Sequence, residues 1–326
     1  MRALRFIVFL TSAVVCVTLL ALVGCTRQAD PWEGKPGKHV LTSFTPLYCF
    51  AQNVAGPDAT VECVMTNRGP HHFDSRPSDA LLVKHADIFF INGLELDEQI
   101  AEKLKEGAGN KDLKIVEVAE AIPEKQLRES GEQHGAEEPG HAHDHHHGKF
   151  DPHVWLGVPE AIIMVGKIRD ELKELDPPHA AGYDSRAAAY IERLKQLQAE
   201  GESMLKDKKE RKIVTFHDSM FYFARTYGLE IADFIEISPG AEASSKKIRQ
   251  VVESCKKNGV RLITVEPQYP SNTSASAILN ELRAQGIDAQ FVEIDPLETA
   301  RPDDLKPTYY EDRMRANLKQ LAEKMR

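Results

Sequence analysis

Segments typical of β-strands and of α-helices alternate twice along this chain, and this alternation limits its fold more than any other feature. The first series has strand-like apolar segments at residues 39–44, 59–65, 86–93 and 113–118. The second has them at residues 212–216, 229–237, 260–265 and 288–294. Strands that alternate with helices form parallel sheets, because each helix carries the chain back to the end of the sheet where the previous strand began. The next strand then runs in the same direction. The sequence therefore predicts an α/β protein with two parallel sheets, and its 326 residues suit two lobes.

Two helical patterns separate the series, at residues 158–175 and 180–206, with Asp176-Pro177-Pro178 between them. The second pattern would form a helix of roughly 40 Å at about 1.5 Å per residue. That length exceeds what one lobe of this size needs. The segment is either an amphipathic helix that covers one lobe or a stiff strut that joins two lobes.

The first residues read as a targeting segment. Within residues 1–24, two arginines precede a long apolar run, which is typical of a secretory signal peptide. Gly24 stands directly before Cys25, and a small residue before a cysteine resembles the bacterial lipobox, in which that cysteine is lipidated. Residues 25–38 then read as a tether. The alternative is an uncleaved transmembrane anchor, and both readings place the chain outside the cytoplasmic membrane and attached to it.

The net charge and the cysteines bear on two questions, whether the chain binds nucleic acid and whether it forms a disulfide. The formal net charge of −9 argues against a nucleic-acid partner, which would require a basic face. Three cysteines follow the signal segment: Cys49, Cys63 and Cys255. Cys49 and Cys63 could pair in an oxidising compartment, or all three could be small buried thiols.

Histidines gather in the segment 131–148, which is rich in Gly, Pro, Glu and Gln and has no apolar periodicity. We expect a solvated loop there that binds metal through its histidines, which are His134, His141, His143, His145, His146 and His147. His153 differs, because Pro152 stiffens the backbone before it and an apolar Val-Trp-Leu follows it. One rigid histidine beside many loose ones indicates a fixed metal site with a metal-collecting loop. The alternative is a low-complexity insert beside an ordinary histidine.

Four metal-capable residues share one kind of position, at the carboxyl end of a predicted strand or in the loop after it: His71, His153, His217 and Asp295. Ligands of open parallel sheets bind beyond these strand ends, so a cleft between the lobes would bring the four together. Three imidazoles and a carboxylate suit zinc, although other first-row divalent ions accept them too. His72 could replace His71, His217 could merely adjoin a helix cap, and Asp295 could only form a turn.

Several motifs resemble those of the zinc-binding, membrane-tethered substrate-binding proteins of bacterial ABC transporters, a family that includes manganese-binding members. They are Gly69-Pro70-His71, Asp151-Pro152-His153-Val154-Trp155, Phe216-His217-Asp218 and Asp295-Pro296-Leu297. The resemblance covers essentially the whole mature chain and implies metal ligands at His71, His153, His217 and Asp295. Manganese members place a glutamate at the position of His217. Glu298-Thr299-Ala300 departs from the family pattern, which leaves open whether Asp295 or a water is the fourth ligand.

The resemblance also implies an architecture, with a metal cleft between two α/β lobes that are joined by a long rigid helix. The lobes are residues 39–157, which include the His-rich loop, and residues 209–326, with linking helices at 158–208. Such a link limits hinge opening, so that ion release needs loop rearrangement or contact with a partner.

The function implied is high-affinity capture of Zn²⁺ in the periplasm or at the cell surface by a lipid-anchored monomer. The ion is cargo, and it passes to the membrane permease of an ABC transporter for import. Alternatives are a manganese or iron carrier, a zinc hydrolase and an adhesin. Against a hydrolase, the chain has no His-Glu-x-x-His motif, and a fourth protein ligand would close the position that catalytic zinc keeps for water.

Overall fold

The computed structural model describes residues 30–130, 148–236, 243–268 and 273–326. The chain divides into two units, Met1–Glu33 and Gly34–Arg326, and every strand named below lies in the second. The predicted signal peptide, Cys25 and the six loop histidines lie outside the described residues. Within the described ranges, no helix combines the length and the apolar character that a membrane crossing requires.

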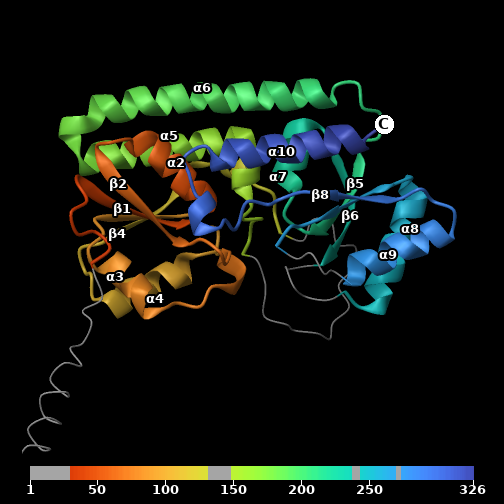
Figure 1. The fold of residues 1–326 in the computed structure, drawn as a ribbon, viewed down its shortest axis with the longest axis horizontal. Helices are drawn as coiled ribbons and strands as arrows, with labels where there is room; N and C mark the ends of the chain where they lie inside the picture. Colours follow the sequence, from red (N-terminus) through yellow and green to blue (C-terminus); the bar gives the residue numbers. More distant parts are fainter. Residues whose placement is uncertain (1–29, 131–147, 237–242, 269–272) are drawn as a thin grey trace, which may run out of the picture. The chain divides into compact units, whose positions relative to one another are not determined.

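The first sheet has four parallel strands in the order β2-β1-β3-β4. Its strands are β1 (Lys38–Phe44), β2 (Ala59–Met65), β3 (Ile88–Ile91) and β4 (Lys114–Glu117). Helices α2 (Thr45–Ala55), α3 (Pro77–Lys84) and α4 (Glu98–Ala108) connect them. Figure 1 shows α3 and α4 on one face of this sheet and α2 on the other. All residues of β3 are buried, as expected for an apolar central strand that is covered on both faces.

The second sheet repeats this topology, with four parallel strands in the order β6-β5-β7-β8. Its strands are β5 (Lys212–His217), β6 (Glu230–Glu236), β7 (Leu262–Val265) and β8 (Gln290–Glu293). The helices of this half are α7 (Phe221–Tyr227), α8 (Ser245–Asn258), α9 (Thr273–Ala284) and α10 (Tyr309–Lys324). The predicted class, two parallel-sheet α/β lobes, is therefore confirmed.

Two helices lie between the sheets in sequence, α5 (Val158–Leu175) and α6 (Ala180–Leu205). The 26 residues of α6 pack on α2 and α5 on the side of the first sheet, and on α7 and α10 on the side of the second (Figure 1). Arg186 Nε donates to the Val54 carbonyl at 2.7 Å, and Arg193 Nε lies 3.0 Å from Glu311. Helix α6 therefore both covers the helices beneath it and connects the two halves, because its two parts contact helices of both.

Gly201 lets α6 approach its neighbours closely. A Cβ at this position would lie 2.4 Å from the Tyr227 ring and 2.7 Å from the Leu318 side chain. Only a residue without a side chain fits between these two buried groups.

Short 3₁₀ helices complete the described chain, and two of them adjoin the candidate site. These are η1 (Pro70–His72), η2 (Val118–Ala121), η3 (Glu124–Gln126), η4 (Val154–Leu156), η5 (Pro177–His179) and η6 (Pro302–Asp304). Proline occupies the first turn of η1, η5 and η6, where its missing N–H leaves no hydrogen bond unmade.

The three described cysteines are free and buried. The possible pairing of Cys49 with Cys63 is therefore wrong, and the alternative of small buried thiols holds. Burial raises the pKa of Cys63 and of Cys255 to about 12, so both stay as unreactive thiols at neutral pH.

Candidate metal site

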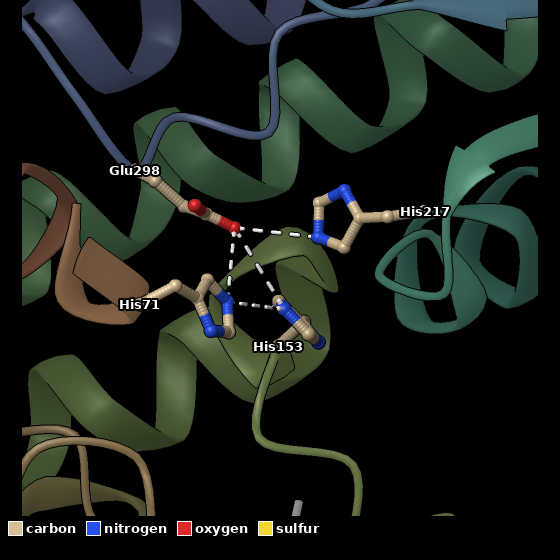
Figure 2. Close-up of side chains that lie close together, drawn as sticks. All are labelled: His71, His153, His217 and Glu298. Atoms are coloured by element: carbon tan, nitrogen blue, oxygen red, sulfur yellow. Dashed lines mark hydrogen bonds and ion pairs between the residues drawn. The ribbon is translucent and has the colours of Figure 1, made fainter. Parts of the chain in front are cut away.

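Four side chains from distant parts of the chain converge on one point in Figure 2: His71, His153, His217 and Glu298. Each contributes one donor atom, and these atoms all lie within 4.8 Å of one another. His71 lies in η1, after β2, and His153 stands immediately before η4. His217 is the last residue of β5, and Glu298 lies in the turn after β8. The three histidines that the sequence predicts as ligands, His71, His153 and His217, therefore come together.

The spacing of the donor atoms is close to that of a tetrahedron around zinc. His71 Nε2 lies 3.4 Å from His153 Nε2. Glu298 Oε1 lies 3.6 Å from His71 Nε2, 3.7 Å from His153 Nε2 and 3.5 Å from His217 Nε2. Donors at the ~2.0–2.1 Å of zinc–nitrogen and zinc–oxygen bonds are about 3.3–3.4 Å apart in a tetrahedron. Four of the six donor separations are thus close to the tetrahedral value, and all six are within 4.8 Å.

Burial makes this arrangement costly without a cation. His153 and His217 are 0% exposed and Glu298 is 2% exposed. Neither His217 Nε2 nor Glu298 Oε1 has a hydrogen-bond partner among the residues that the structure describes. Buried polar atoms are normally paired, and leaving one unpaired costs about 1–3 kcal/mol. These two atoms form only an ion pair with each other, at 3.5 Å, and both point at the common centre in Figure 2, so the group fits a bound metal ion.

Two buried carboxylates orient the rings from behind. Asp151 Oδ1 lies 2.8 Å from His153 Nδ1, and Glu266 pairs with His217 Nδ1. A ring that donates from Nδ1 keeps its Nε2 lone pair for a metal, which is the usual role of a carboxylate behind a ligating histidine. The arrangement therefore fixes both the tautomer and the direction of these two imidazoles.

The side chains of this group differ in the direction in which their pKa values are shifted. Burial, together with His217 and His71, holds the pKa of His153 well below its usual value, so this ring is neutral. Burial also opposes the charge on His217, but Glu266 and Glu298 outweigh it and raise the pKa of His217 to about 10. Burial disfavours the Glu298 carboxylate, but His71 and His217 hold its pKa well below the usual value. In the ion-free protein, a proton on His217 thus faces a negative Glu298.

The structure does not bring the predicted ligand Asp295 into this group. Its Oδ1 accepts the amide of Leu297 at 2.8 Å instead. The Asn317 side chain holds the amide and the carbonyl of Asp295, at 2.9 and 2.8 Å. Leu297 has a φ of 62°, in the left-handed region, and this turn directs the next residue, Glu298, at the histidines. The carboxylate of Asp295 is occupied by the turn that presents Glu298.

Sequence reasoning missed Glu298 although a signal was present. Two acids flank Pro296 and Leu297, and either could reach a site beyond β8. The choice between them depends on the left-handed turn at Leu297, a conformation that side chains other than glycine rarely adopt and that the residue types do not indicate.

Comparisons with known proteins show which family this chain resembles. Residues 40–324 match the family described as zinc-uptake complex component A, periplasmic, or ZnuA. The zinc-binding lipoprotein AdcA of Streptococcus pneumoniae is 30% identical over 305 residues, which are 93% of this chain and 58% of AdcA. The manganese-binding lipoprotein MntA of Halalkalibacterium halodurans is 29% identical over 259 residues, covering 78% of this chain and 80% of MntA.

A solved structure, that of Zn(II)-bound AdcA from Streptococcus pneumoniae, superposes with a TM-score of 0.67. It is 28% identical, and the match covers 88% of this chain and 57% of AdcA. The chain thus spans little more than half the length of this zinc-binding relative. Because the family match extends over almost all of the described fold, the chain belongs to the ZnuA family of zinc-uptake components.

Proposed function

We propose that this protein captures a Zn²⁺ ion outside the cytoplasm and delivers it to the permease of an ABC transporter. The observation that carries this proposal is the buried group of three imidazoles and one carboxylate at near-tetrahedral spacing. The names of the relatives support the same ion, since AdcA is described as zinc-binding and the family as a zinc-uptake component.

The number of protein donors favours a carrier over an enzyme. A catalytic zinc has three protein ligands and keeps a position for water or substrate. Here Glu298 Oε1 stands 3.5–3.7 Å from all three imidazole Nε2 atoms, so it occupies the fourth corner. We therefore assign Glu298, with His71, His153 and His217, to the binding of transported zinc.

Manganese is the second candidate, because the relative MntA is described as manganese-binding. Donors at about 2.1 Å around an octahedral ion are separated by about 3.0 Å between neighbours. Four of the six donor separations, at 3.4–3.7 Å, are nearer to the tetrahedral value for zinc than to this one. Imidazole-rich sites also suit zinc better than manganese, which prefers carboxylate, carbonyl and water.

The remaining predictions extend this proposal to the whole chain. Residues 1–24 are a signal peptide, Cys25 carries the lipid, and 25–38 tether a monomer to the membrane in the periplasm or at the cell surface. Residues 39–157 and 209–326 are the lobes, joined by 158–208, and the segment 131–148 binds further ions weakly. The packing of α6 on helices of both halves supports release through loop rearrangement or permease contact rather than through wide hinge opening.

The test is a competition between zinc and manganese for residues 26–326, with and without the segment 131–148. We expect one tight zinc site that survives the deletion and disappears in His153→Ala. His179→Ala is the matched control, because His179 also pairs with an aspartate, Asp176, at 2.7 Å but lies outside the group. Loss of tight binding on deletion, with His153→Ala unaffected, would reject the proposed site.

A further inference from the structure

A buried arginine lies between the two turns that carry His153 and His217. Arg128 Nη1 donates to Asp151 at 3.3 Å and to Asp218 at 2.8 Å, and Nη2 donates to the other oxygen of Asp218 at 3.1 Å. The Arg128 side chain is only 2% exposed. Asp151 stands two residues before His153, and Asp218 directly follows His217. One guanidinium therefore joins the turn before η4 to the end of β5.

The link from Arg128 to His153 runs through a single carboxylate. Asp151 Oδ2 accepts from the guanidinium, while its Oδ1 accepts from the His153 amide at 3.0 Å and contacts His153 Nδ1 at 2.8 Å. A displacement of Arg128 would therefore move the group that orients the ring. On the other side, Asp218 is bonded to both guanidinium nitrogens, which is the strong, directional geometry that arginine forms with carboxylates.

Arg128 is itself held in place. Its carbonyl accepts the Asp151 amide at 2.9 Å, and its amide donates to the Tyr222 hydroxyl at 3.2 Å. The Tyr222 hydroxyl in turn donates to the Asp151 carbonyl at 2.9 Å. The guanidinium carbon also lies 5.1 Å from the centre of the Phe221 ring. These contacts fix the backbone and the head group of Arg128 relative to the first residues of α7.

We propose that Arg128 is a positioning residue that sets the separation of His153 and His217 and thereby favours tetrahedral zinc over a six-coordinate ion. The inference rests on the proposed function and adds a determinant of ion choice. Tetrahedral and octahedral donor spacings differ by only about 0.4 Å at these bond lengths, so a preference for one of them requires rigidly held ligand-bearing turns. A planar guanidinium bonded to both turns supplies such rigidity, whereas a flexible ammonium does not.

Arg128→Lys in residues 26–326 tests the proposal, with Arg225→Lys as the matched control. Arg225 also stacks on Phe221, as well as on Tyr222, and donates to the Gln126 carbonyl and to Glu160, both at 2.7 Å, but its hydrogen bonds go to neither Asp151 nor Asp218. The measurements are zinc and manganese affinities by competition, and the visible absorption of bound Co²⁺, which is intense only in tetrahedral sites.

We expect Arg128→Lys to weaken zinc binding about tenfold or more, as is typical for groups behind metal ligands. Manganese binding should fall less, and the Co²⁺ band should lose intensity. Arg225→Lys should leave all three unchanged. Equal affinities and spectra for Arg128→Lys and the unaltered protein would overturn the inference, as would an equal loss in Arg225→Lys.

Asp218→Asn provides a second route if Arg128→Lys does not fold. It weakens the two-point bond to Asp218 and leaves Arg128 paired with Asp151. A lower ratio of zinc to manganese affinity is expected, and an unchanged ratio would overturn the inference. Failure of the proposed function is distinguishable, because the unaltered protein itself would then lack a tight zinc site.

Discussion

His217 Nδ1 is hydrogen-bonded to the carboxylate of Glu266, 49 residues further along the chain and only 4% exposed at its side chain. This contact and Glu298 raise the pKa of His217 to about 10 against the effect of burial. Because His153 is neutral, His217 is the site of the proton that a zinc ion must displace. We predict that zinc binding at pH 7 releases about one proton from His217. Calorimetry in buffers of different ionisation enthalpy measures this number.

The same proton sets the direction of the pH dependence. Below the pKa of His217, each pH unit upward raises the fraction of the deprotonated, metal-binding ring about tenfold, so zinc affinity should rise from pH 7 toward pH 10. An affinity that stays flat over this range, with no proton released, would contradict the assignment.

Glu266→Gln should flatten this profile. The amide keeps an acceptor for His217 Nδ1 but removes the charge that raises the pKa of His217. Near pH 7, zinc then has less proton competition at His217, which offsets part of the loss. At pH 9 the weaker donor strength of the His217 ring dominates, so zinc affinity should fall by about 10–100-fold. Titrations at both pH values give the comparison, and a parallel loss at pH 7 and pH 9 would mean that Glu266 acts only through packing.

Glu298 and Asp295 are distinguished by substitution. Glu298→Gln removes the charge that faces three imidazoles and should weaken zinc binding at least about 100-fold. Asp295→Asn keeps an oxygen that can accept the Leu297 amide and should cost less than about tenfold. Competition titrations rank the two variants, and the reverse ranking would restore Asp295 as the fourth ligand.

The close approach of α6 to its neighbours predicts an effect on stability. Gly201→Ala drives a Cβ into the Tyr227 ring and the Leu318 side chain, so unfolding free energy should fall by about 1–3 kcal/mol. Gly166→Ala is the control within α5, because a Cβ there meets nothing within 4 Å and alanine favours the helix by up to about 1 kcal/mol. Urea unfolding of both variants without metal should move them in opposite directions.

Periodicity and helix-ending residues were sufficient to predict the eight strands and most helices. Gly228 and Gly259, for example, end α7 and α8 in left-handed conformations, as glycines after apolar periodic segments commonly do. His71 and His217 were predictable because they stand after or at the ends of strands, and His153 because Pro152 and an apolar Val-Trp-Leu hold it. These features depend on residue type and spacing alone.

The groups behind the ligands were not predictable in this way. Glu266 and Arg128 act on residues 49 and 90 positions away, and neither stands in a motif of its own. Asp295 lies outside the group because its carboxylate turns back to the Leu297 amide, while the left-handed Leu297 directs Glu298 toward the histidines. Side-chain direction at a turn depends on backbone angles that the sequence pattern does not specify.

The four donors belong to segments that lie far apart along the chain, from η1 to the turn after β8. A bound ion would therefore act as a removable cross-link, comparable to a disulfide that opens without a reductant. Loading would fasten four turns at once, and unloading would free them together. A partner that contacts the segments around these largely buried turns could then recognise whether the protein is full without any rotation of the two halves about α6.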